Sequence, residues 1–146
     1  MLRHLLMEIS GLNPNVEDIK YNLRYPKENK LIKLNIDKVL KLHKKHEPEF
    51  SIDSRKSNNV ISQSRFDNAK EYWKKYSLNQ KWLRPDGTRS LFDDMFFEPS
   101  IVMFDNKNKF GFIDGRHRLI AMKELGYTTA MFEIPKEQQS RFKQLT

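Results

Sequence analysis

The sequence contains no cysteine, only 5 glycines among its 146 residues, and no apolar run long enough to span a bilayer. The lack of cysteine excludes disulfides, thiolate metal sites and a cysteine nucleophile. The first ten residues, MLRHLLMEIS, are interrupted by His4 and Glu8 and therefore lack the apolar centre of a secretory signal. We expect a cytoplasmic protein that does not bind a membrane.

The charge that is present is mostly basic. The chain has 27 Lys and Arg against 19 Asp and Glu, a net charge of +8, and residues 1–80 hold 16 of the basic and 10 of the acidic side chains. A basic surplus favours a polyanionic partner, which could be nucleic acid, a nucleotide or an acidic protein. A solvated lysine-rich surface explains the same surplus, and composition leaves both interpretations open.

The spacing of apolar residues predicts an α+β protein with a small mixed sheet and flanking helices. We expect a helical N-terminal extension over residues 1–29, packed on one domain over 30–146. The first predicted elements are a short helix carrying Val16, Ile19 and Leu23, a strand over 31–36, and a helix capped by Asp37 that ends before Pro48. A helix over about 64–77 and a hairpin of strands 100–105 and 109–114 follow. The last elements are a helix over 116–125 ended by Gly126 and a strand over 129–134 with a polar tail behind it.

One stretch, FGFIDGRHRLIAMKELGY, carries the main candidate site. Its strand ends at Asp114-Gly115, and the triplet Arg116-His117-Arg118 opens the next helix, where the macrodipole repels cations. A glycine at this point lets a phosphate approach the unpaired amides of the first turn, and a guanidinium matches phosphate oxygens. In the other interpretation Asp114 caps the helix by accepting from the amide of His117, and the cations point into solvent. The spacing leaves both open.

Three further clusters have a functional and a structural interpretation. The pair His43 and His46 has metal-ligand spacing but no third ligand in sight. Carboxylates before the hairpin could hold Mg²⁺ beside a phosphate. Aromatic residues on the 64–77 helix could stack on bases, although an amphipathic helix that buries them is the simpler explanation. These carboxylates and aromatic residues are Asp93, Asp94 and Glu98, and Tyr72, Trp73 and Tyr76.

The segments EPSIVMFD, FGFIDGRHRLIAMKELGY and TTAMFEIP resemble the core of the ParB/sulfiredoxin-like superfamily. That core has a strand, a hairpin strand ending in Gly-x-His-Arg or Gly-Glu-Arg-Arg, a helix and a final strand. The Asp-Gly-x-His-Arg form is also similar to the DGQHR domains, and FDNAK, residues 66–70, is similar to the opening of the sulfiredoxin helix. The resemblance covers roughly residues 31–135 and rests mainly on one motif in its strand-helix context.

The resemblance implies that Gly115, His117 and Arg118 hold nucleotide phosphates, with Lys70 reaching them from the earlier helix and Ser77 adding a hydroxyl contact. Arg116 stands where sulfiredoxins carry their cysteine, so the sulfinic-acid reductase reaction is excluded. Arg116 also replaces the glutamate of the ParB motif, which departs from the ParB pattern of CTP and metal handling.

We therefore expect a protein that binds ATP or CTP with Mg²⁺ and acts in DNA-related processes. Its activity would be that of an NTP hydrolase, a phosphotransferase or a nuclease, with Asp114 and His117 as catalytic candidates. Arg116 would join the phosphate contacts, and Asp114 and Glu98 would hold the metal. The alternative expectation is a non-catalytic basic module that binds DNA or an acidic host protein, of the kind that plasmids and phages use as accessory or counter-defence factors.

Overall fold

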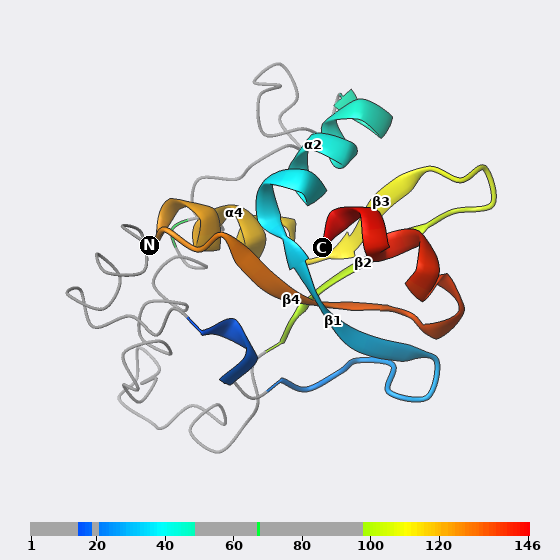
Figure 1. Cartoon of the computed structure of the whole chain (residues 1–146), viewed down its shortest axis with the longest axis horizontal. Coiled ribbons are helices and arrows are strands. Elements are labelled where there is room, and N and C mark those ends of the chain that lie inside the picture. The colour runs from blue at the N-terminus through cyan, green and yellow to red at the C-terminus, as the bar shows by residue number, and fades with distance from the viewer. Residues whose placement is uncertain (1–14, 19–20, 49–66, 68–97) are drawn as a thin grey trace.

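The computed structural model describes residues 15–18, 21–48, 67 and 98–146 (Figure 1). Its elements combine helices with one four-stranded sheet, so the predicted α+β class is confirmed. In chain order they are η1 (Val16–Asp18), β1 (Asn29–Asn35), α2 (Ile36–His46), β2 (Ser100–Phe104), β3 (Phe110–Asp114), α4 (Arg116–Glu124), β4 (Thr129–Pro135) and η4 (Lys136–Leu145).

Several predictions fall outside these residues. They include the helix over about 64–77, of which only Asp67 is described, in a helical conformation. Lys70 and Ser77, the two contacts that the resemblance places on that helix, also lie outside the described residues, as do the carboxylates and aromatic residues of the further clusters apart from Glu98. No helix in the described ranges combines the length and the apolar character needed to cross a membrane.

The sheet has the strand order β1-β4-β2-β3. β1 pairs with β4 and β2 with β3 in antiparallel fashion, whereas the central pair, β2 and β4, is parallel. The predicted hairpin is confirmed. Asp105 shapes its turn, since its Oδ1 accepts from the amides of Lys107 and Lys109 at 2.8 and 2.9 Å, and Asn108 adopts φ 62°, which asparagine tolerates better than most residues.

The helix α2 starts directly from the end of β1. Its N-cap is Asn35, whose side chain accepts from the amide of Lys38 at 2.9 Å. The prediction that Asp37 caps this helix is therefore wrong. Asp37 lies in the first turn, where its negative charge interacts favourably with the helix dipole, and it forms an ion pair with Lys123 at 3.2 Å.

The core lies on the face of the sheet that carries α2 and η4. Phe110 joins these two elements, because its ring meets His43 of α2 and Phe142 of η4 edge-on, with centroids 6.4 and 6.3 Å apart. The predicted polar tail after Pro135 is thus wrong. The ten residues of η4 bury Phe142 and Leu145, whose spacing of three matches the turn of a 3-10 helix.

The N-terminal segment covers the other face of the sheet near β4. Glu133 points away from Phe132, because side chains alternate along a strand, and it is fully buried. Its carboxylate accepts from the amides of Arg24 and Tyr25 at 2.7 and 3.0 Å. A carboxylate, and not the carbonyls of a helix, therefore accepts from these amides. The prediction of a helix that reaches Leu23 is wrong, because the described helical residues of this segment are the single 3-10 turn η1.

Candidate functional site

The junction between β3 and α4 is built on Gly115. This residue has φ 90° and serves as the N-cap of α4 without a side chain, while its carbonyl accepts from Leu119 at 3.0 Å and from the Ser100 hydroxyl at 2.8 Å. A Cβ on Gly115 would lie 2.6 Å from Ser100 Oγ and 2.9 Å from Arg118 Nη2. Glycine is therefore required here for two reasons: the positive φ disfavours other residues, and Ser100 and Arg118 already fill the space that a Cβ would need.

Asp114 does not cap α4. Its Oδ1 accepts from the amide of Gly115 at 2.8 Å, and α4 has neither a side-chain cap nor an acidic residue in its first turn. The interpretation in which Asp114 accepts from the amide of His117 is therefore wrong. Within the described residues, therefore, no side chain caps the positive end of the α4 dipole, which is the end that favours an anion.

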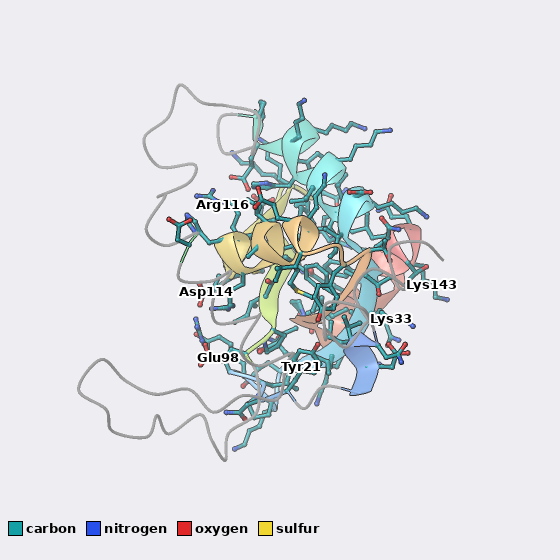
Figure 2. All side chains as sticks on the ribbon, turned by 90° about the vertical axis from the view of Figure 1, so that its left-hand side faces the viewer. Tyr21, Lys33, Glu98, Asp114, Arg116 and Lys143 are labelled. Atoms are coloured by element: carbon teal, nitrogen blue, oxygen red, sulfur yellow. The ribbon has the colours of Figure 1, made fainter. Side chains whose placement is uncertain are left out.

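Asp114 belongs to a cluster of four charged side chains from three parts of the chain. Its Oδ2 accepts a hydrogen bond from Arg24 and lies 3.8 Å from Arg118 Nη2. Arg118 Nη1 lies 3.8 Å from a carboxylate oxygen of Glu98, and its Nη2 donates to the carbonyl of Pro99 at 3.4 Å. Figure 2 shows Asp114 and Glu98 on the same side of the molecule. We call Arg24, Glu98, Asp114 and Arg118 the charge cluster.

The cluster sets the ionisation of Asp114. Burial alone would raise the pKa of Asp114, but the hydrogen bond from Arg24, the charge of Arg118 and the amide of Gly115 outweigh it and hold the pKa below its ordinary value. The hydrogen bond with Asp114 in turn raises the pKa of Arg24. A carboxylate of lowered pKa is a weak base, so Asp114 is suited to binding a cation or positioning a group more than to abstracting a proton.

The cationic triplet does not converge on one point. Arg116 and Arg118 are two residues apart, which places them about 200° apart around the helix axis. Arg118 is in the charge cluster, while burial lowers the pKa of Arg116 and the nearby carboxylate of Glu47, just after α2, opposes that shift. Figure 2 shows Arg116 and Asp114 on different sides of α4. His117 lies between the two arginines in the first turn and is half-buried.

A cavity of about 250 Å³ opens beside the charge cluster. Polar groups make up most of its wall, and two members of the cluster, Arg24 and Glu98, line it. The cavity is smaller than the pockets that enclose drug-sized ligands, but it has room for a phosphate group and several waters. The lining residues are Asn22, Leu23, Arg24, Glu98, Pro99, Ile101 and Glu133.

The described residues contain no group of three or more His, Asp or Glu side chains that could hold a metal ion. Asp114 and Glu98 each lie 3.8 Å from Arg118, and two carboxylates form a site for Mg²⁺ only when phosphate oxygens and water complete its shell. The histidine pair has structural contacts. The ring of His43 packs edge-on against Phe112, with centroids 4.9 Å apart, and His46 Nδ1 accepts from the amide of Phe110 at 2.7 Å.

The structure thus brings together three of the predicted site residues, Gly115, Arg118 and Asp114, and adds Glu98, which was predicted only as a metal ligand. It also adds Arg24, which sequence reasoning missed. Nothing local marks Arg24, because it stands 90 residues before its partner in a segment that was assigned to a helix.

In comparisons with known proteins, no protein-family model matches the chain, and no curated protein or solved structure matches it significantly.

Proposed function

We propose that this protein is a ParB/sulfiredoxin-like module that binds the phosphate groups of a nucleotide at the start of α4. The order of elements supports the proposal. β2, β3, the Gly-Arg-His-Arg motif, α4 and β4 follow one another in the arrangement that carries the resemblance. The nucleotide would be ATP or CTP, and its phosphates would lie between Arg118, Arg24 and the first turn of α4.

The observation that carries the proposal is the loose hold on Arg118. Its contacts with Asp114, Glu98 and the carbonyl of Pro99 are 3.8, 3.8 and 3.4 Å long, whereas a guanidinium bound to a carboxylate or phosphate makes contacts of about 2.8 Å. Its Nε is buried and has no hydrogen-bond partner in the described part of the chain. A phosphate that enters the cluster would give this guanidinium the short contacts that it lacks.

Arg24 provides the second cation of the proposed site. It is bound to Asp114, whose negative charge would otherwise repel a phosphate at the start of α4. The pair therefore neutralises the carboxylate, and a modest rotation of the exposed Arg24 side chain that keeps this contact would turn its other N–H groups toward the ligand. The side chain of Arg24 is 43% exposed, so this rotation does not have to displace core residues.

Mg²⁺ fits the proposed site only together with the nucleotide, because the two carboxylates need phosphate oxygens and water to complete its coordination shell. Asp114 and Glu98 would hold it, and the ion would supply charge neutralisation on the phosphates. Asp114 and His117 are the proposed catalytic residues if the bound nucleotide or a phosphodiester is cleaved, in which case positioning and electrostatic stabilisation would provide most of the rate enhancement.

Calorimetric titration of the full chain with ATP, CTP and GTP, each with Mg²⁺, tests the proposal. We expect one of the three to bind, and Arg118→Ala to weaken that binding about tenfold or more, as loss of a charge-assisted contact does. Arg141→Ala is the matched control, since Arg141 is an exposed arginine of η4 and should leave binding within about twofold. Absence of heat with all three nucleotides, or equal binding by both variants, would contradict the proposal.

A further inference from the structure

Among the described residues, nine basic side chains lie on segments that the nucleotide proposal does not use. α2, η4 and the turn of the β2–β3 hairpin together carry nine lysines and arginines, all of them exposed, against three acidic residues. The acidic residues are Asp37, Asp105 and Glu137, and Glu47 follows α2 directly. We call the basic set the basic face. It consists of Lys38, Lys41, Lys44, Lys45, Lys107, Lys109, Lys136, Arg141 and Lys143.

The three segments are held side by side by the fold. The aromatic contacts of Phe110 join α2 to η4, and Lys38 Nζ donates to the carbonyl of Thr146, at the end of η4, at 3.3 Å. Arg141 donates to Asn108 Oδ1 in the hairpin turn at 3.1 Å. Figure 1 shows η4 next to the hairpin with α2 beside it. The fold therefore holds the three basic segments next to one another.

Two of these acidic residues, Asp37 and Asp105, already have partners. Asp37 pairs with Lys123 of α4 at 3.2 Å. Asp105 is held in the hairpin turn, where the hydrogen bond from the amide of Lys109 is the main cause of its lowered pKa. On α2 itself, Lys41 and Lys45 form no ion pair with a carboxylate of the described residues. These two lysines therefore present their charge to solvent.

The chemistry of the basic face points to a duplex polyphosphate. Protein interfaces centre on apolar and aromatic side chains, and single strands are gripped by aromatic stacking. The exposed large hydrophobic residues among those described are Tyr25 and Ile113, which lie outside this face. Lysines spaced three and four residues apart on a helix form a row whose Cβ atoms are about 5–6 Å apart, and their ammonium groups can contact backbone phosphates without reading bases.

We propose that the basic face binds the phosphate backbone of double-stranded DNA without sequence preference. Figure 2 shows Lys143 of this face on the opposite side of the molecule from Asp114 and Glu98. The inference therefore does not rest on the nucleotide site, and either proposal can fail without the other.

Fluorescence anisotropy of a labelled 24-base-pair duplex, titrated with the full chain between 50 and 200 mM NaCl, tests the inference. Four phosphate contacts would give a log–log salt slope of about −3.6 and a loss of affinity of about 100-fold over this range. Replacing two exposed lysines of α2 in Lys41→Gln/Lys45→Gln should weaken binding about tenfold at 100 mM salt and reduce the slope by about 2.

The charge-matched control is Lys27→Gln/Lys33→Gln, which removes two exposed lysines outside the basic face and should change affinity by less than about twofold. The inference is overturned if the duplex does not bind at 50 mM NaCl or if both double variants lose the same affinity. It is also overturned if the corresponding single strand or polyglutamate binds as tightly as the duplex, because the face would then recognise a different polyanion. Circular dichroism of each variant verifies that it is folded.

Discussion

The charge cluster and the basic face use the same kinds of side chain in opposite ways. In the charge cluster, Arg24 and Arg118 face two carboxylates, Asp114 and Glu98, at distances up to 3.8 Å, and the group is partly buried. On the basic face, nine exposed cations outnumber the acidic residues, of which Asp37 pairs with Lys123 of α4. The charge of Arg118 is thus balanced within the fold, whereas Lys41 and Lys45 of α2 form no ion pair with a described carboxylate.

This difference shows why the net charge of +8 does not locate a binding site. The cationic triplet opposes a helix dipole, which would favour an anion site. However, Arg118 is balanced by carboxylates, and Arg116 lies on a different side of α4. The lysines of α2 follow an ordinary amphipathic pattern, and only their assembly with η4 and the hairpin makes them a continuous surface. We expect substitutions in the two regions to have correspondingly different effects on stability.

The largest effect on stability is expected for Gly115→Ala. The new side chain would force a left-handed backbone on alanine and would meet the Cα of Ser100 at 2.7 Å, so we expect a loss of about 3 kcal/mol in the free energy of unfolding. Gly111→Ala is the control, because its Cβ would meet only the flexible end of Glu47, and we expect a change of no more than about 1 kcal/mol. Urea denaturation measures both. Equal losses for the two variants would mean that the backbone at Gly115 tolerates a side chain as well as the backbone at Gly111 does.

The next largest effect is expected for Glu133→Gln. The buried carboxylate accepts from the amides of Arg24 and Tyr25 and from the side chain of Asn29 at 2.6 Å. An amide group cannot accept with both of its heavy atoms, so we expect a loss of about 2 kcal/mol. Glu137→Gln, at an exposed position of η4, should stay within about 0.5 kcal/mol. A Glu133→Gln protein as stable as the native chain would show that the N-terminal segment is anchored by other contacts.

A smaller effect is expected from pH through Asp114. Its pKa is lowered in the folded protein, so its contribution to stability is present above the ordinary pKa of 3.8 and is lost as pH falls through the folded value. Asp114→Asn should be less stable than the native chain near neutral pH, and the gap should close below about pH 4. Denaturant titrations from pH 7 to pH 2 measure this gap. A gap that stays constant with pH would mean that the charge of Asp114 does not stabilise the fold.

The smallest effect on stability is expected on the basic face. Lys41→Gln/Lys45→Gln changes two exposed side chains that form no ion pair with described residues, so the free energy of unfolding should stay within about 0.5 kcal/mol of the native value. Thermal unfolding followed by circular dichroism measures this. A large loss of stability would show that these lysines are balanced within the fold like the charge cluster, and the contrast between the two regions would disappear.

Local patterns predicted the elements that form their own hydrogen bonds within a short stretch. The hairpin follows from two apolar strands around a turn with Asp105 and Asn108, and the end of α4 follows from Gly126, which adopts φ 103°. Prediction from local patterns failed where a residue distant in sequence, instead of a neighbouring one, supplies the stabilising contact. Glu133 takes the amides of the N-terminal segment, and η4 is stabilised by two apolar residues that reach the core.

The candidate site shows the same division. Asp114, Gly115 and Arg118 are close in sequence, so their proximity could be predicted, and helix periodicity already separates Arg116 from Arg118. Which of the two arginines meets Asp114 and Glu98 could not be predicted. Arg24 could not be predicted at all, because no local rule connects residues 90 positions apart. That contact depends on Glu133, whose carboxylate holds the backbone of Arg24 against the sheet.

By itself, the amino-acid sequence determined the α+β class, the strand-glycine-helix junction and the excess of positive charge, since periodicity, backbone freedom and ionisation are properties of short segments. Only the tertiary structure decided which charges are balanced and which form a continuous exposed surface. The physical reason is that electrostatic interactions depend on distances in space, and the sheet order and the packing of α2 and η4 on Phe110 set those distances.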